Sequence, residues 1–151
     1  MIALIQRVTE ARVEVDGNPV GAIGRGILAL IGVERGDGEA QVERLVEKVL
    51  AYRIFPDDSG KMNLSLLDIK GGLLAVPQFT LAADTKTGTR AGFSTAASPD
   101  DGLRLFSLFV EMSKKKNPGT EKGQFGADMR VSLVNDGPVT FWLQVSAGKQ
   151  S

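Results

Sequence analysis

The chain of 151 residues contains no histidine and no cysteine. Without histidine, it cannot form a Ser-His-Asp triad, and no imidazole serves as a general base near neutral pH. Without cysteine, it has no thiolate nucleophile, no disulfide, no cysteine-ligated zinc and no iron–sulfur cluster. Any reaction must therefore use carboxylates, hydroxyls, amides, lysine or arginine, the main chain, or a group that the substrate brings.

An excess of charge and long apolar runs are also missing. The 18 Lys+Arg are balanced by 18 Asp+Glu, which argues against a polybasic binder but leaves room for a local phosphate-binding patch. The longest apolar stretch, around Ile27 to Val33, is far shorter than the roughly 18 residues of a membrane span. Only four apolar residues follow Met1 before the polar pair Gln6-Arg7, too few for the apolar region of a signal peptide. We therefore expect a cytoplasmic protein without a membrane segment.

The length and the order of the expected elements indicate one mixed domain. A chain of this size fits a single domain of roughly 100 to 200 residues. β-branched residues predict strands over 2–9 and 11–15, followed by a turn over 16–19. A continuous apolar run predicts a buried strand over 26–33. Strands followed by interleaved helices and strands are typical of an α/β (mixed α+β) domain.

Two amphipathic helices are expected. Apolar residues at spacings of three and four predict the first over 39–53. The second should begin at Pro99, after Ser98 as its N-cap, and run to about Lys115. The apolar face of this second helix should carry Leu103, Phe106 and Val110.

The first candidate site lies at the end of a strand expected over 72–81, where a long polar loop over 82–97 begins. Pro77 cannot donate to a strand ladder, so it should mark an edge or a bulge. The segment is either an ordinary strand end or a place where main-chain amides point into a pocket and bind an oxyanion. The amides concerned are those of Gln78, Phe79 and Thr80.

The second candidate is Asn135-Asp136-Gly137-Pro138-Val139-Thr140, between strands expected over 129–134 and 139–145. Its composition favours a hairpin turn. A bond before proline is cis in only about 5 to 6% of cases, yet a cis bond here would align two carbonyl groups as a receptor for an ammonium group. Spacing alone leaves both interpretations open.

Hydroxyl and basic side chains give weaker signals. Thr80 and Ser94 are candidate nucleophiles, but capping or loop hydrogen bonds are favoured because the chain has no base to activate them. The chain has one basic cluster, which is either a solvated helix end or a surface that contacts phosphate. It consists of lysines 114–116, Lys122 and Arg130. The carboxylates show no paired spacing, and no glycine-rich loop matches a nucleotide-binding motif.

Five segments closely resemble the bacterial D-aminoacyl-tRNA deacylases, in one register from Met1 to about Val145. They are Met1 to Val8, Tyr52 to Phe55, Lys61 to Leu64, Gln78 to Asp84, and Ser132 to Thr140. The resemblance implies a compact single domain over residues 1–145, with a largely antiparallel, barrel-like sheet and two main helices. Residues 146–151 would then form a C-terminal tail.

The resemblance also implies a reaction and a partner. Family members hydrolyse the ester that joins a D-amino acid to the terminal adenosine of tRNA, and they clear glycine from wrongly charged tRNA. They are homodimers without a metal or an organic cofactor, and their cis Gly-Pro bond reaches into the site of the opposite subunit. Chiral selection is thereby assigned to Gly137 and Pro138, supported by Arg7. The ester-facing site is assigned to Gln78, Phe79 and Thr80.

One position departs from the family pattern, because Pro77 stands where family members usually have serine. A hydroxyl and an amide hydrogen are lost there, so oxyanion binding must come from the amides of Phe79 and Thr80. An aminoacyl ester is already activated, and its vicinal 2′-hydroxyl can assist attack, which suits a chain without histidine. Two other functions stay open: a non-catalytic RNA-binding dimer, with Pro77 as a sign of decay, and a general esterase.

Overall fold

The computed structural model describes residues 1–147, so residues 148–151 of the expected tail lie outside the described residues. Within residues 1–147 the chain forms a mixed α/β domain with two long helices and one short one. Its elements in chain order are β1 (Ile2–Val15), β2 (Asn18–Ile23), β3 (Gly26–Gly32), α1 (Glu39–Ala51), β4 (Phe55–Pro56), β5 (Met62–Leu64), α2 (Leu66–Ile69), β6 (Gly72–Pro77), the 3₁₀ helix η1 (Phe79–Ala82), α3 (Pro99–Lys116), β7 (Thr120–Lys122) and β8 (Arg130–Gln144).

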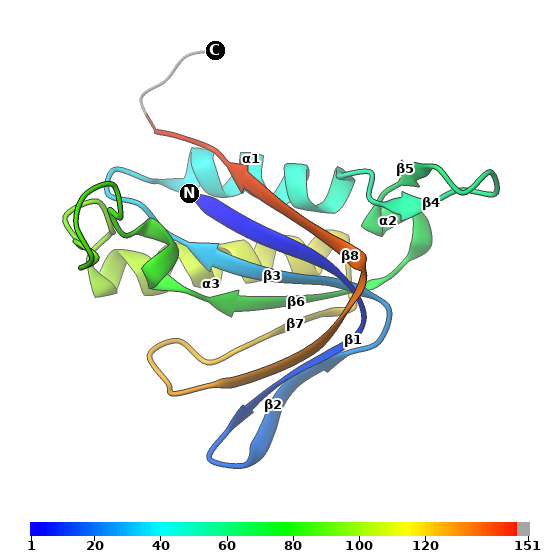
Figure 1. Ribbon diagram of the computed structural model, residues 1–151, viewed down its shortest axis with the longest axis horizontal. Helices are drawn as coiled ribbons and strands as arrows, with labels where there is room; N and C mark the ends of the chain where they lie inside the picture. The colour runs from blue at the N-terminus through cyan, green and yellow to red at the C-terminus, as the bar shows by residue number, and fades with distance from the viewer. Residues whose placement is uncertain (148–151) are drawn as a thin grey trace.

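Six of these strands form one strongly curved sheet around β1 (Figure 1). One edge of β1 pairs with β8, while its other edge pairs with β3 over its first half and with β2 over its second half, all antiparallel. β6 runs parallel to β3, and β7 runs parallel to β6. β2 bends back toward β7, so that a Cβ atom at Gly21 would lie 2.6 Å from the Lys122 carbonyl oxygen. The expected barrel-like, largely antiparallel sheet is confirmed, with two parallel pairs on one side.

The β1–β2 hairpin is tighter than the sequence predicts. Val15 pairs with Asn18, which leaves only Asp16 and Gly17 in the turn, with φ values of 52° and 79°. Two positive φ angles define a type I′ turn, whose twist matches that of the flanking strands. The strands expected over 2–9 and 11–15 form the single strand β1, which pairs with β8 from Ile2 to Glu14.

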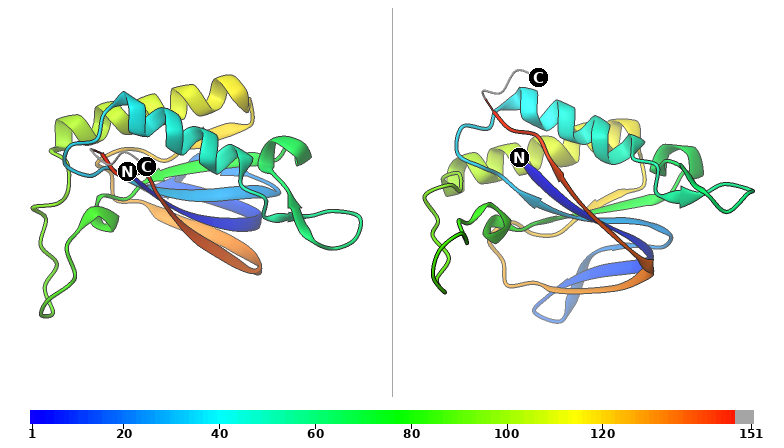
Figure 2. Two further views of the ribbon diagram at one scale, coloured as in Figure 1. Left: turned by 90° about the horizontal axis from the view of Figure 1, so that it is seen from above. Right: turned by 45° about the horizontal axis from the view of Figure 1, so that its top comes forward.

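The sheet has an apolar core on each face. α1 and α3 lie side by side over one face, as the views in Figure 2 show. Along β3, Ile27, Ala29 and Ile31 belong to the core under the helices. Leu28 belongs to a second, smaller core inside the curl, and Leu30 packs against it. Burial on both faces explains why this strand is a continuous apolar run rather than an alternating one.

The ends of α3 are set by capping groups. The Ser98 hydroxyl accepts a hydrogen bond from the Asp101 N–H at 3.3 Å, and Pro99 occupies the first helical position. At the other end, the Asn117 N–H donates to the Ser113 carbonyl at 2.8 Å. The predicted N-cap and start of this helix are confirmed, as is its end to within one residue.

The buried face of α3 differs from the expectation in one residue. Phe106 and Val110 are buried as predicted, but the side chain of Leu103 is 48% exposed. The prediction for Leu103 is wrong because the Phe125 ring packs against Gly102, where a Cβ atom would lie 3.3 Å from the ring. Gly102 therefore faces inward and its neighbour Leu103 outward. No helix among residues 1–147 is long and apolar enough to cross a membrane.

Candidate functional site

The first candidate segment is a turn rather than the end of a strand. β6 ends at Pro77, and η1 begins at Phe79, so the strand expected to run to Leu81 stops four residues earlier. The Gln78 N–H donates to the Ile31 carbonyl at 2.8 Å and is therefore engaged in the sheet. The N–H groups of Phe79 and Thr80 have no acceptor among residues 1–147, as expected for the first residues of a helix. Two of the three predicted amides are thus available.

Pro77 lies in an interior strand, not at the predicted edge or bulge. β6 pairs with β3 on one side and with β7 on the other. Successive residues of β6 form hydrogen bonds alternately with these two neighbours. Leu73 and Ala75 bond to the β7 side, so the nitrogen of Pro77 faces that side as well. β7 pairs with β6 only as far as Ala75, so at Pro77 the β7 ladder provides no carbonyl that would need an N–H donor. The strand tolerates proline here because its neighbour has already ended.

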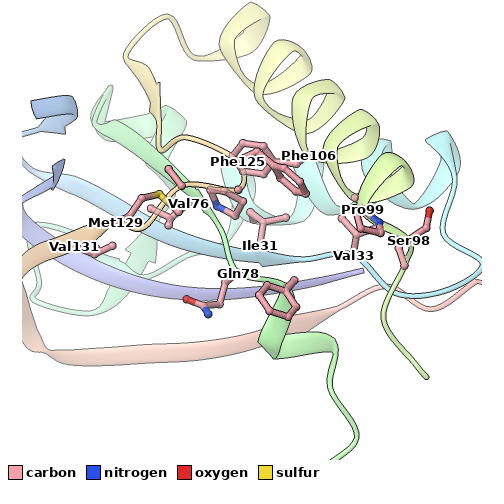
Figure 3. A pocket seen from close by; sticks show the side chains of 16 residues that line it. Ile31, Val33, Val76, Gln78, Ser98, Pro99, Phe106, Phe125, Met129 and Val131 are labelled. Carbon is pink, nitrogen blue, oxygen red and sulfur yellow. The ribbon is translucent and has the colours of Figure 1, made fainter. Parts of the chain in front are cut away.

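A pocket of about 460 Å³ opens beside this turn. Figure 3 shows Phe106 and Phe125 on one wall, with Gln78 on the opposite side. The Phe79 ring also lines the pocket and is 63% exposed. The remaining walls are apolar for the most part and come from β3, β6, the start of α3 and the segment 125–131: Ile31, Val33, Val76, Pro77, Ala97, Ser98, Pro99, Gly102, Gly126, Ala127, Met129 and Val131.

Thr80 borders a different hollow. This second hollow, of about 550 Å³, is also lined by Trp142 and Gln144 of β8. The Thr80 hydroxyl accepts a hydrogen bond from the side-chain nitrogen of Gln78, and no hydrogen bond joins it to a carboxylate or an amine within residues 1–147. An amide nitrogen that donates a proton cannot activate a hydroxyl, so the geometry does not favour Thr80 as a nucleophile.

The second candidate segment is a bulge within one strand, not a turn between two strands. Gln6 pairs with Thr140 and Val8 pairs with Asn135, so four residues, 136–139, lie opposite Arg7 alone. The Gly137–Pro138 peptide bond within this bulge is cis. Both residues are exposed to solvent. The backbone of the bulge therefore stands out from the sheet.

Arg7 holds the bulge in place. Its Nη1 donates to the Ile54 carbonyl at 2.7 Å, and its Nε donates to the Asp136 carbonyl at 3.0 Å. Across the bulge, the Val139 N–H donates to Oδ1 of Asn135 at 3.0 Å. Gly137 has φ +138°, and a Cβ atom there would lie 2.7 Å from Cγ2 of Val139 and 3.2 Å from Nη2 of Arg7. Only glycine fits this position without a shift of its neighbours.

The two groups of predicted site residues lie far apart within one chain. Arg7 pairs with Ile27, which pairs with Leu73, so the bulge is level with the start of β6. From Leu73 to Pro77 the strand advances by about 13 Å, and β8 is three strands away from β6, a further ~14 Å across the sheet. Figure 1 shows the bend of β8 and η1 at opposite ends of the sheet. The structure joins Arg7 to Gly137 and Pro138 but does not bring them to residues 78–80.

The chemistry that the pocket offers is mainly main-chain chemistry. Within residues 1–147 no three His, Cys, Asp or Glu side chains gather in a way that would hold a metal ion. Ser94 is exposed on the loop after η1. The lysines at 114–116 end α3, whereas the pocket lies at the beginning of that helix. These weaker candidates therefore contribute no group to the pocket.

Most of the residues that line the pocket could not be predicted from the sequence. Met129 and Phe125 reach the pocket because the segment after β7 passes over the end of β6. Neither residue belongs to a motif, and the pairing of β7 with β6 is a long-range contact that no local pattern encodes. Asn135 belongs to the second candidate segment, but the sequence does not predict that its side chain accepts the Val139 N–H, because this hydrogen bond forms only in the bulge.

Comparison with known proteins gives consistent matches. The model of the family described as D-Tyr-tRNA(Tyr) deacylase matches residues 4–144. A D-aminoacyl-tRNA deacylase of Thioalkalivibrio sulfidiphilus is 63% identical over 145 residues, which cover 96% of this chain and 97% of the relative. The proteins of the same name from Vibrio cholerae and Alkalilimnicola ehrlichii are 61% and 60% identical over 144 residues, 95% of this chain and 99% and 96% of theirs.

Two solved structures share the fold of this chain. One, named c-Myc DNA unwinding element binding protein, has a TM-score of 0.93 and 38% identity, and the match covers 97% of this chain and all of that one. Another, described as a probable eukaryotic D-amino acid tRNA deacylase, has a TM-score of 0.80 over 95% of this chain and 98% of that one, and at 17% identity it shows the fold alone. Because the family model and several relatives match nearly the whole chain, the protein belongs to the D-Tyr-tRNA(Tyr) deacylase family.

Proposed function

We propose that the protein hydrolyses the ester bond of D-aminoacyl-tRNA and releases the free D-amino acid and tRNA. One observation carries the proposal: the N–H groups of Phe79 and Thr80 are free in the turn that follows β6, where Phe79 lines the apolar pocket and Thr80 borders the second hollow. Paired main-chain donors stabilise the oxyanion that forms when an ester carbonyl is attacked. The name of the relatives at 60 to 63% identity supports the same reaction.

The pocket suits the terminal adenosine of tRNA. A volume of about 460 Å³ lies within the usual range for small-ligand sites. Phe125 and Met129 offer an aromatic ring and a polarizable sulfur to the face of a purine base. With the base in the pocket, the ester on the ribose would lie next to the turn that begins at Phe79.

The reaction needs no side-chain base. Water adds to the ester carbonyl, the amides of Phe79 and Thr80 bind the resulting oxyanion, and the bond to the ribose 3′-oxygen then breaks as that oxygen takes a proton. The 2′-hydroxyl of the same ribose lies next to the reacting carbonyl and assists the attack. This route suits a chain without histidine or cysteine, in which the Thr80 hydroxyl has no activating partner.

Selection for handedness would come from a second copy of the chain. In a homodimer, Gly137 and Pro138 of one subunit would enter the site of the other, where their carbonyl oxygens hold the α-ammonium group. An L side chain would then clash with the bulge, whereas a D side chain would point outward. Glycine has no side chain to clash, so glycyl-tRNA would also be cleaved.

Two features support a dimer. The bulge is exposed and lies at the opposite end of the sheet from the pocket of its own chain. Within residues 1–147, β8 pairs only with β1, and Val134 and Trp142 on this strand are about half exposed. A long edge strand with exposed apolar residues is a surface on which another chain can pair.

A deacylation assay with D-tyrosyl-, L-tyrosyl- and glycyl-tRNA tests the proposed function. We expect the D-tyrosyl and glycyl esters to be cleaved and the L-tyrosyl ester to persist. Cleavage of the D and L esters at equal rates would contradict selection by the bulge. Cleavage of simple esters without a neighbouring hydroxyl would instead indicate a general esterase.

A non-catalytic RNA-binding dimer is the second candidate function. Pro77 favours it, because proline removes a hydroxyl and an amide hydrogen at the mouth of the pocket. One structural relative is named for binding DNA rather than for hydrolysis. Binding of D-tyrosyl-tRNA without turnover would select this function. For the deacylase function we expect a cytoplasmic location, because aminoacyl-tRNA is used there.

A further inference from the structure

Two phenylalanine rings form an exposed pair next to the pocket. The rings of Phe79 and Phe93 have centroids 5.5 Å apart and are tilted by 41°. They are 63% and 49% exposed, so the pair presents aromatic surface to solvent rather than to the core. Phe79 lines the pocket, whereas Phe93 does not. The aromatic surface therefore continues from the pocket onto the loop that follows η1.

Hydrogen bonds hold this loop in shape. The N–H and carbonyl groups of Asp84 and Gly92 bond to each other at 2.8 and 2.9 Å, which fixes the residue before Phe93. At its base, Thr95 donates through its hydroxyl to the Ala82 carbonyl and accepts the Arg35 N–H through its own carbonyl. Phe93 is thus presented by a braced loop.

The tip of the loop carries positive charge. Lys86 and Arg90 lie in the seven residues between Asp84 and Gly92, and both are exposed. Neither forms an ion pair with any residue from 1 to 147. Asp84, the one acidic residue over 83–97, accepts the Lys86 N–H at 3.0 Å. Figure 2 shows the tip projecting away from the sheet.

We propose that Phe93, Lys86 and Arg90 form a binding surface for the single-stranded nucleotides that precede the terminal adenosine of the substrate. This proposal rests on the proposed function, since it follows the tRNA chain outward from the adenosine in the pocket. Stacking of bases on aromatic rings, combined with cations along the backbone, is the usual mode of binding single-stranded nucleic acid without sequence preference. Phe93 supplies the stacking ring, and the two cations contact phosphates.

Comparison of a long and a short substrate tests this surface. The substrates are D-tyrosyl-tRNA and 3′-O-D-tyrosyl-adenosine, which lacks the preceding nucleotides. Lys86→Ala and Arg90→Ala should each lower kcat/KM for the tRNA several-fold. Each should also make the slope of log kcat/KM against log salt concentration less steep by about 0.7 per lost phosphate contact. Hydrolysis of the nucleoside ester should stay unchanged. Lys48→Ala and Arg44→Ala, on the exposed face of α1, are matched controls that should change neither rate.

Two substitutions test Phe93, one that removes the aromatic ring and one that keeps an aromatic ring. Phe93→Leu should lower kcat/KM for the tRNA about five- to hundredfold, whereas Phe93→Trp should retain it, because stacking needs an aromatic face. Both variants should hydrolyse the nucleoside ester like the wild type and keep its oligomeric state in size-exclusion chromatography.

Three results would overturn the inference. The loop variants could cleave the tRNA as fast as the wild type, or they could lose the tRNA and nucleoside activities equally. A Phe93→Leu variant that changes the oligomeric state would show that the ring is covered by a second copy instead. If the wild type cleaves neither substrate, the proposed function fails as well, and this outcome is distinct from the other three.

Discussion

Gly137 is a candidate site residue at which a larger side chain would not fit. A methyl group there would overlap Val139 and approach Arg7, in a backbone region that L residues rarely adopt. We expect Gly137→Ala to lower kcat/KM for D-tyrosyl-tRNA at least tenfold or to weaken discrimination against the L ester, because a shift of about 1 Å at a positioning group can cost up to a hundredfold. Steady-state kinetics on both esters measure this effect.

The matched control is Gly60→Ala in the turn between β4 and β5. Gly60 also has a positive φ of 79°, but nothing lies within 4 Å of a Cβ atom there. This variant should lose about 1 kcal/mol of unfolding free energy and keep its kinetics. Wild-type kinetics and selectivity in Gly137→Ala would show that the bulge is only a structural turn.

Thr80 is expected to matter little for turnover. Its hydroxyl accepts a hydrogen bond from Gln78 and borders a hollow other than the apolar pocket. Thr80→Ala removes this hydroxyl but keeps the main-chain N–H, so kcat should fall by less than about tenfold. Single-turnover deacylation gives the answer. A folded but inactive variant would restore the hypothesis of a covalent Thr80 intermediate.

The sequence predicts individual site residues unevenly. The resemblance points to Arg7, and the structure places its guanidinium against the bulge, because the contact involves neighbouring strands. The engagement of the Gln78 amide could not be predicted, since it depends on the Ile31 carbonyl of a strand far away in sequence. Contacts set by pairing between distant strands leave no local pattern.

At the scale of elements, the amino group of Met1 links three parts of the chain. It lies 2.9 Å from both Glu34 and Asp37, which connect β3 to α1, and it donates to the Val145 carbonyl after β8. The Asp37 side chain is almost fully buried, whereas that of Glu34 is 25% exposed. These bonds fasten the ends of β1, β3 and β8 to one another beside α1.

The two carboxyl groups of this cluster respond to acid with opposite sign. Burial alone would raise the pKa of Glu34, but hydrogen bonds from Gln144 and from the Met1 amino group lower its pKa below the ordinary value. Burial raises the pKa of Asp37 despite the same amino group. Ionised Glu34 therefore stabilises the fold at pH values above its unfolded pKa, and this stabilisation is lost as the pH falls through its lowered folded pKa. Asp37, whose folded pKa is raised, partly offsets the loss.

Glu34→Gln tests this assignment. The variant should be less stable than the wild type at pH 7 by about 1 kcal/mol, because a charged hydrogen bond to a buried amino group is lost. Its stability should also fall less between about pH 6 and pH 3, since the site no longer binds a proton on unfolding. Urea denaturation at several pH values measures both, with the exposed Glu47→Gln on α1 as control. An equal loss of unfolding free energy between about pH 6 and pH 3 in the variant and the wild type would contradict the role of Glu34.

Element boundaries were predictable where side chains set them. Ser98 and Pro99 mark the start of α3, and both signals are local. The segment 135–138 has the composition of a turn but lies in one continuous strand, because pairing with β1 resumes on both sides of the bulge. A turn composition cannot distinguish a hairpin from a bulge when the partner strand is not known.

At the scale of the whole molecule, the curl of the sheet decides where the candidate site residues lie. The fold class and the barrel-like sheet were predicted, but the sequence alone did not show that residues 78–80 and the bulge face opposite ends of the sheet. That arrangement follows from the parallel placement of β6 beside β3. It also requires two chains if both groups are to act on one substrate.

Complementation between two impaired variants tests this requirement. Gly137→Ala damages the bulge, and Phe79→Pro removes one oxyanion donor at the first position of η1, where proline is tolerated. If the bulge acts in the opposite subunit, each mixed dimer contains one intact site, and randomly mixed dimers should recover about a quarter of wild-type activity. Deacylation by the co-expressed variants is the measurement. Activity no greater than the sum of the separate variants would place the bulge in its own subunit's site.

In the proposed reaction, main-chain amides and a hydroxyl of the substrate replace a side-chain base. The most direct measurement compares single-turnover hydrolysis of two D-tyrosyl-tRNAs, one ending in adenosine and one in 2′-deoxyadenosine. We expect rapid cleavage of the first and at least about a hundredfold slower cleavage of the second, with similar binding of both. Equal rates for the two substrates would contradict assistance by the 2′-hydroxyl.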